Sequence, residues 1–169
     1  SGKTRVITVK IAHLLETMGL NPLDILAVTF TNKAAGEMQE RAVGLSPRAE
    51  KVLIRTFHSF GAWLLRRNAA AIGLHANFSI YDDDDMVSLL KTLYPDRERK
   101  ALSRYASLIA RAKDYALTPE DPLSDVSSDP EFPGMYAAYE EKLRRIGNAD
   151  FGDLILRSTE LLESVPEVK

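Results

Sequence analysis

The first four residues of the sequence, Ser1 to Thr4, form the second half of a phosphate-binding loop motif. In such a loop, backbone N–H groups around Gly2 contact the phosphates at a helix N-terminus, where the helix dipole favours negative charge. Lys3 would neutralise charge on the β- and γ-phosphates, and the Thr4 hydroxyl would coordinate Mg²⁺. The upstream glycine of the motif does not precede Ser1 in this sequence. We therefore expect either a chance match or a chain that begins inside a phosphate-binding loop.

Two further stretches, Thr29–Lys33 and Thr56–Ser59, follow apolar runs and share one pattern. Each ends its run on Thr-Phe, continues with polar residues and then enters a helical pattern. In open parallel sheets, ligands bind beyond the carboxyl ends of the strands. Hydroxyl, amide and imidazole groups beside helix N-termini can hold phosphate oxygens there. Phe30 adds a ring on which a nucleic-acid base could stack.

The aromatic and imidazole side chains of these stretches also have structural alternatives. Phe57 continues the alternation of its predicted strand, which favours a core position. The sequence shows no nucleophile–base set around His58, so a hydrogen bond at the start of a helix is the simpler role. Phe30 is equally compatible with core packing and with ligand contact.

The elements that position these residues alternate along residues 5–73. Continuous apolar runs rich in β-formers predict buried parallel strands over 24–30 and 51–57. Amphipathic patterns predict helices over 5–18, 32–42 and 59–73. The expected helix ends are Thr31 or Asn32, Ser59, Gly19 and Gly73. This alternation of helices and strands is typical of βαβ units that cover a parallel sheet.

The second half of the sequence is predicted to be mostly helical. Amphipathic stretches cover 85–94, 98–117, 133–147 and 150–165. Residues 118–133, rich in Pro, Ser and Asp, form the one long predicted loop. The four aspartates at 82–85 are predicted to cap a helix rather than bind a metal, because a short helix start cannot point four carboxylates inward.

Composition restricts the function classes. Residues 1–81 carry 10 Lys and Arg against 5 Asp and Glu, and residues 82–169 carry 12 against 19. A polyanion would therefore bind the first half, although a solvated charge imbalance is the simpler reading. The absence of cysteine excludes disulfides and fits a cytoplasmic location. No stretch has the ~20 apolar residues of a membrane span, and no membrane partner is expected.

The segments SGKTRVIT, LAVTFTNKAAGEMQERA, IRTFHSFGAWLLRR, NFSIYDDDD and NADFGDLI resemble the UvrD/Rep/PcrA-type superfamily 1 DNA helicases in order and spacing. The resemblance covers essentially the whole chain. It implies an α/β fold, a partial RecA-like P-loop parallel sheet with an all-helical inserted subdomain. The implied domains are a RecA-like core over 1–81, a helical insert over 82–148 and a return to the core over 149–169.

The resemblance also implies site residues. Lys3 and Thr4 would be catalytic, Ser1, Gly2, Lys3, Thr4 and Arg5 would bind ATP, and Thr4 would hold Mg²⁺. The residues implied to bind DNA are Phe30, Thr31, Asn32, Lys33, Thr56, His58 and Ser59.

The function implied is that of an N-terminal fragment of an ATP-dependent 3′→5′ DNA helicase acting on single-stranded DNA and duplex junctions in DNA repair or replication. The fragment alone is expected to be inactive, and the open edge of an incomplete sheet predicts pairing with a second copy. Gly152 and Gly36 depart from the family pattern, which usually has DFDDL at 150–154 and a basic residue after TFTNKAA. The alternatives are a helicase-like subunit of a recombination nuclease complex and a non-enzymatic helical interaction module.

Overall fold

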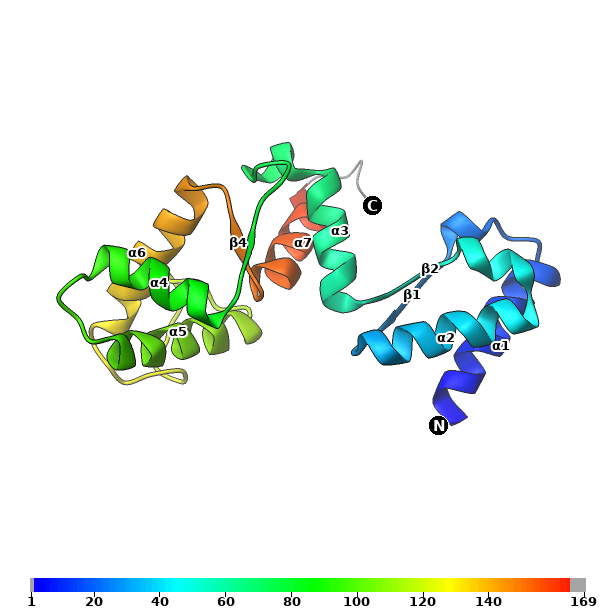
Figure 1. Ribbon diagram of the computed structural model, residues 1–169, viewed down its shortest axis with the longest axis horizontal. Coiled ribbons are helices and arrows are strands. Elements are labelled where there is room, and N and C mark those ends of the chain that lie inside the picture. The colour runs from blue at the N-terminus through cyan, green and yellow to red at the C-terminus, as the bar shows by residue number, and fades with distance from the viewer. Residues whose placement is uncertain (1, 165–169) are drawn as a thin grey trace. The chain divides into compact units, whose positions relative to one another are not determined.

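The computed structural model describes residues 2–164, which form two compact units (Figure 1). The first unit extends to Phe60 and the second begins at Gly61. The structure is mixed α/β, with predominantly helical elements and two small parallel sheets. None of the described helices has the length and apolar character that a membrane crossing requires.

The first unit is built around two parallel strands, β1 (Leu26–Thr29) and β2 (Leu53–Thr56). The register pairs Leu26 with Leu53 and Thr29 with Thr56, so both strands end at the same level. Helix α1 (Gly2–Glu16) precedes β1, and α2 (Asn32–Leu45) connects β1 to β2. The 3₁₀ helices η1 (Pro22–Asp24) and η2 (Pro47–Lys51) complete the connections. The predicted parallel strand pair is therefore confirmed, with each strand shorter than expected.

The core of the first unit is formed by apolar residues of α1, β1, α2 and η2, together with the residues that directly precede β1 and β2. Its buried members are Ile11, Leu15, Ile25, Ala27, Met38, Ala42, Ala49 and Val52. The predicted helix ends are confirmed at Gly19, which follows α1 with φ +66°, and at Thr31, which caps α2. Positive φ at Gly19 is a conformation that side chains with a Cβ rarely adopt.

Helix α3 (Phe57–Arg67) begins earlier than predicted. The expectation that Ser59 caps it is wrong, because Ser59 lies inside the helix. The Thr56 hydroxyl instead accepts a hydrogen bond of 3.1 Å from the Ser59 N–H, which is the geometry of a helix cap. The 3₁₀ helix η3 (Ala69–Ile72) follows and ends at Gly73, with φ +67°. The single helix predicted over 59–73 is therefore divided, because α3 ends at Arg67 and only η3 reaches Gly73.

The second unit has a helical part made by α4 (Asp83–Leu93), α5 (Arg99–Asp114) and α6 (Phe132–Arg145), drawn from green to yellow in Figure 1. Their inward faces share a core whose largest fully buried side chains include Tyr136, Tyr139 and Phe132. The predicted cap at the aspartate run is confirmed. Asp82 accepts from the Asp85 N–H at 2.9 Å, and the Asp85 carboxylate accepts from the Asp82 N–H at 3.2 Å.

The rest of the second unit contains a parallel strand pair that the sequence did not predict, β3 (Ile80–Tyr81) with β4 (Ala149–Asp150). Helix α7 (Asp153–Ser164) follows β4 after a two-residue turn. Gly61 of α3 lies so close to α7 that a Cβ there would be 2.3 Å from the Leu154 carbonyl oxygen. A glycine is thus required for this helix contact.

Candidate functional site

The start of α1 carries the predicted nucleotide-binding residues. Gly2 and Lys3 are exposed and Thr4 is half-buried, at the first positions of a 15-residue helix. The first N–H groups of a helix have no partner within it, and the dipole makes this end positive. Thr8 donates to the carbonyls of Thr4 at 3.2 Å and Arg5 at 3.0 Å, which fixes the first turn. The start of α1 is thus open to solvent at Gly2 and Lys3, and the phosphate site stays a prediction, while Ser1 lies outside the described residues.

The predicted DNA-binding residues gather where β1 and β2 end, in the same unit as α1 but on different elements. We call this region, residues 30–33 and 56–59, the carboxyl rim. Because Thr29 pairs with Thr56, the two polar stretches begin side by side. The Thr31 hydroxyl accepts a hydrogen bond of 3.1 Å from the Ala34 N–H and so starts α2 at the rim. Asn32 and Lys33 are exposed in the first turn of that helix.

The second stretch of the carboxyl rim is more firmly held by the protein. Thr56 is buried, and its hydroxyl donates to the Ser59 Oγ at 2.8 Å. His58 is half-buried and takes part in interactions within the protein. The Thr56 hydroxyl therefore has a structural role at the start of α3. The N-termini of α2 and α3 both lie at the rim.

Two aromatic residues of the carboxyl rim, Phe30 and Phe57, directly follow the last paired residues of β1 and β2. Phe30 is 87% exposed, and its ring centroid lies 5.4 Å from that of Phe57, with the ring planes tilted by 50°. The core position considered for Phe30 is excluded by this exposure. The core position expected for Phe57 is also wrong, because Phe57 begins α3 and is 41% exposed. An exposed ring with one face outward is suited to stacking on a base without regard to sequence.

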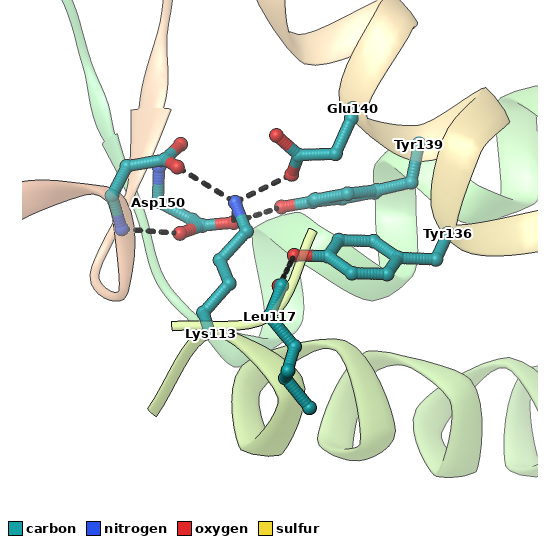
Figure 2. A network of polar contacts seen from close by, with 7 residues as sticks. Lys113, Leu117, Tyr136, Tyr139, Glu140 and Asp150 are labelled. Atoms are coloured by element: carbon teal, nitrogen blue, oxygen red, sulfur yellow. Dashed lines mark hydrogen bonds and ion pairs between the residues drawn. The ribbon is translucent and has the colours of Figure 1, made fainter. Parts of the chain in front are cut away.

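A second group of chemically active residues is buried in the second unit (Figure 2). Lys113 of α5 extends toward Glu140 and Tyr139 of α6 and toward Asp150 of β4. Its Nζ lies 2.5 Å from Glu140, 2.6 Å from Asp150 and 2.8 Å from Asp153. The Tyr139 hydroxyl donates to Asp150 at 2.9 Å. We call these five residues the lysine cluster.

Burial and charge compete in setting the pKa values of the lysine cluster. Burial lowers the pKa of Lys113, but the charges of Asp153, Asp150 and Glu140 together raise it by more. The net pKa therefore lies above its ordinary value. Burial raises the pKa of Glu140 more than the neighbouring ammonium lowers it. The pKa of Asp153 is raised by burial in the same way. The Lys113 ammonium thus faces two carboxyl groups, Glu140 and Asp153, whose pKa values are raised by burial.

The turn between β4 and α7 is shaped around this lysine. The Asp150 carboxylate accepts from the Asp153 N–H at 2.9 Å, and the Asp153 carboxylate accepts from the Asp150 N–H at 3.1 Å. This reciprocal pair starts α7. A Cβ at Gly152 would be 2.7 Å from the Lys113 Cβ, closer than packed carbons approach. The glycine that departs from the family pattern therefore lies against the lysine.

Three carboxylates of the lysine cluster could in principle hold a metal ion. Oxygen atoms of Glu140, Asp150 and Asp153 lie within 4.8 Å of one another, the one such group among the residues that the structure describes. The Lys113 ammonium already contacts all three. The protein's own cation therefore fills this position.

Sequence reasoning found the acidic segment at 150–153 but missed Lys113. A signal was present in the periodicity of α5. Its buried side chains lie on one face, at Leu102, Tyr105, Ala106, Ile109, Ala112 and Lys113. A lysine that continues a buried apolar stripe at helical spacing requires a buried anion, and this is what the structure provides.

Comparison with known proteins finds similarity along the whole chain. The model of the UvrD/REP helicase N-terminal domain matches residues 1–169. ATP-dependent DNA helicase Rep of Escherichia coli (strain K12) is 40% identical over 176 residues, covering 100% of this chain and 26% of that protein. ATP-dependent DNA helicase PcrA of Bacillus subtilis (strain 168) is 41% identical, covering 99% of this chain and 24% of that protein. PcrA of Leuconostoc citreum is 38% identical, with coverage of 99% and 24%.

The chain is therefore similar to helicase N-terminal domains along its whole length, and its first unit contains a parallel strand pair. It belongs to the UvrD/REP helicase N-terminal domain family. The chain spans about a quarter of the length of these curated relatives.

Proposed function

We propose that this chain is the N-terminal part of an ATP-dependent DNA helicase that moves 3′→5′ along single-stranded DNA and unwinds duplexes at junctions. The names of the relatives, ATP-dependent DNA helicases Rep and PcrA, support this class of activity. The single observation that carries the DNA-binding part is the exposed ring of Phe30 at the carboxyl rim.

The carboxyl rim supplies both parts of a single-strand track. A phosphate backbone can be held by the positive ends of α2 and α3 and by Asn32, Lys33, His58 and Ser59. A base can stack on Phe30, which contributes about 1–3 kcal/mol per base in such proteins. Neither contact depends on base identity, as translocation requires. The excess of basic residues in 1–81 favours the same half of the chain.

The start of α1 supplies part of the nucleotide site. Lys3 and the N–H groups of the first turn would hold ATP phosphates, with Arg5 beside them, and the Thr4 hydroxyl would hold Mg²⁺. The bound metal would neutralise charge that develops on the phosphates during transfer. Because phosphoryl transfer also needs an oriented water and further charge stabilisation, we expect Lys3 and Thr4 alone to give no useful ATP hydrolysis.

Predictions on domain division, location and self-association accompany this function. The division into a RecA-like core over 1–81, a helical insert over 82–148 and a return to the core over 149–169 stays a prediction. So does the cytoplasmic location. Pairing of two copies through the open edges of the β1–β2 pair is also predicted, and sedimentation of the isolated chain would test it.

The test is the variant Phe30→Ala in the complete protein. We expect its affinity for oligo-dT to fall by about fivefold to 150-fold, the range that loss of one stacked base implies. ATP hydrolysis per nucleotide travelled should rise, because the strand slips between steps. Leu23→Ala is a matched control, since Leu23 is 72% exposed in the same unit but lies outside the rim. Unchanged oligo-dT affinity of Phe30→Ala would refute the DNA-binding proposal.

A further inference from the structure

Phe30 and Phe57 are placed together by the register of the strand pair. Each residue directly follows the last paired position, Thr29 on β1 and Thr56 on β2. Parallel strands that end at one level bring the next side chains to neighbouring positions on the same edge. The ring contact at 5.4 Å follows from this register, although the two residues are far apart in the sequence.

The two rings differ in how firmly the backbone holds them. Phe57 is the first residue of α3. The preceding Thr56 is buried, and its hydroxyl both donates to the Ser59 Oγ and accepts from the Ser59 N–H. Phe30 lies in the bend between β1 and α2 and is 87% exposed. A largely exposed ring on a bend can sample several rotamers, and binding must freeze one of them. Phe57, with its backbone held at the helix start and its ring less exposed at 41%, offers the better restrained surface for the Phe30 ring.

The geometry of the ring pair also leaves part of Phe30 open to a base. Centroids 5.4 Å apart are in the range of rings in direct contact. The contact with Phe57 takes up only a small part of Phe30, which is 87% exposed and keeps ring surface on which a base can stack. We therefore treat Phe57 as the support and Phe30 as the platform of the pair.

We infer that Phe57 is a positioning residue, which holds the Phe30 ring in the orientation that stacks on a base of single-stranded DNA. This inference rests on the proposed function and deepens it. Phe57 acts through Phe30 and need not touch the DNA. Its contribution is to reduce the conformational freedom that Phe30 loses when a base binds.

The experiment compares Phe57→Leu, Phe57→Tyr and Phe30→Ala in the complete protein, with Leu23→Ala as the control. The probe is oligo-dT with one internal 2-aminopurine, whose fluorescence is quenched by stacking. Phe57→Leu keeps the apolar bulk but removes the flat ring. We expect it to weaken binding about two- to tenfold, the value of one aromatic pair expressed as affinity. Quenching at saturating protein should also fall, and Phe57→Tyr should restore both.

The possible outcomes separate the two proposals. If Phe30→Ala loses affinity while Phe57→Leu binds and quenches like the parent, the positioning role is overturned and the DNA-binding function stands. If Phe30→Ala retains full affinity, the proposed function itself fails. Quenching is read per bound complex, so partial unfolding of Phe57→Leu cannot imitate the effect. Normal quenching in its bound complexes would overturn the positioning role even if its affinity were reduced.

Discussion

The Lys113 ammonium and the Asp150 carboxylate form an ion pair of 2.6 Å in which both side chains are 1% exposed. The pair joins α5 to the start of the β4–α7 turn, segments that are 37 residues apart. Two charges this deeply buried are stable only when their remaining hydrogen-bonding capacity is met. Tyr139 and Asp153 supply hydrogen bonds to this pair, and Glu140 forms a further ion pair with the ammonium. The lysine cluster therefore ties the helical part of the second unit to β4 and α7.

Removal of the cation should destabilise the second unit strongly. Lys113→Met keeps the length of the stem but leaves three carboxylates without a counter-charge. We expect a loss of about 3–5 kcal/mol in unfolding free energy at neutral pH, as for other buried pairs with one partner removed. Urea unfolding monitored by circular dichroism measures it. Lys100→Met, at an exposed position of the same helix, should change stability by less than about 0.5 kcal/mol. Equal stability of the two variants would contradict the central role of Lys113.

Burial raises the pKa of Glu140 in the folded state, so its contribution to stability should change with pH in the acidic range. A group whose folded pKa exceeds its unfolded value, about 4.3 for Glu, stabilises the fold below that value and loses this contribution as pH rises. Glu140→Gln removes the titration. The parent protein should therefore lose stability relative to Glu140→Gln as the pH rises from about 4 toward neutrality.

The measurement for Glu140→Gln is a series of urea unfolding curves between pH 4 and pH 8. At neutral pH we expect the variant to lie within about 1 kcal/mol of the parent, far from the loss expected for Lys113→Met. Glu141→Gln is the control, since Glu141 is exposed and pairs with Arg145 on the surface of the same helix. A parent that gains stability over Glu140→Gln with rising pH would show that the ionised form is the favoured one.

Much of the fold could be predicted from the sequence because it depends on local periodicity. The strands at β1 and β2 and the amphipathic helices of both units follow apolar patterns that each segment carries by itself. The β3–β4 pair could not be predicted in this way. Its strands have two residues each, too few to show a period, and their pairing joins Ile80 to Ala149 across three helices.

The candidate sites show the same division between local and long-range information. The polar residues of the carboxyl rim follow from strand ends, which the sequence marks. The contact between Phe30 and Phe57 depends on strand register, which the sequence did not reveal. Lys113 lies on an apolar stripe that the sequence shows. Its carboxylate partners come from other elements, and only the structure identifies them.

Gly152 should be sensitive to any side chain, because the stem of Lys113 occupies the space that a Cβ would need. Gly152→Ala would place its Cβ 2.7 Å from the Lys113 Cβ and 3.0 Å from its Cδ. Since the ammonium is fixed by the lysine cluster, the stem cannot move away freely. We expect a loss of about 1–3 kcal/mol in unfolding free energy, typical of an overpacked core.

The matched control for Gly152→Ala is Gly134→Ala. A Cβ at Gly134 meets nothing within 4 Å, and the residue lies in α6. Alanine is the better helix former, so this variant should be stabilised by up to about 1 kcal/mol. Thermal unfolding followed by circular dichroism should shift the two variants in opposite directions. A shift of Gly152→Ala toward higher stability would show that the Lys113 stem has room to move.

Gly36 provides a test of the direction of the DNA track, on the basis of the proposed function. It is exposed in the first half of α2, which begins at the carboxyl rim, and a Cβ there would meet nothing within 4 Å. Gly36→Lys adds a charge that can reach a phosphate on this side. We expect tighter oligo-dT binding and a steeper salt dependence, with the slope of log K against log salt more negative by about 0.7 for one added contact. Gly44→Lys is the control, because Gly44 is equally open but lies near the opposite end of the same helix. It adds the same net charge, so an equal change in slope for both variants would show a non-specific charge effect rather than a strand path across the start of α2.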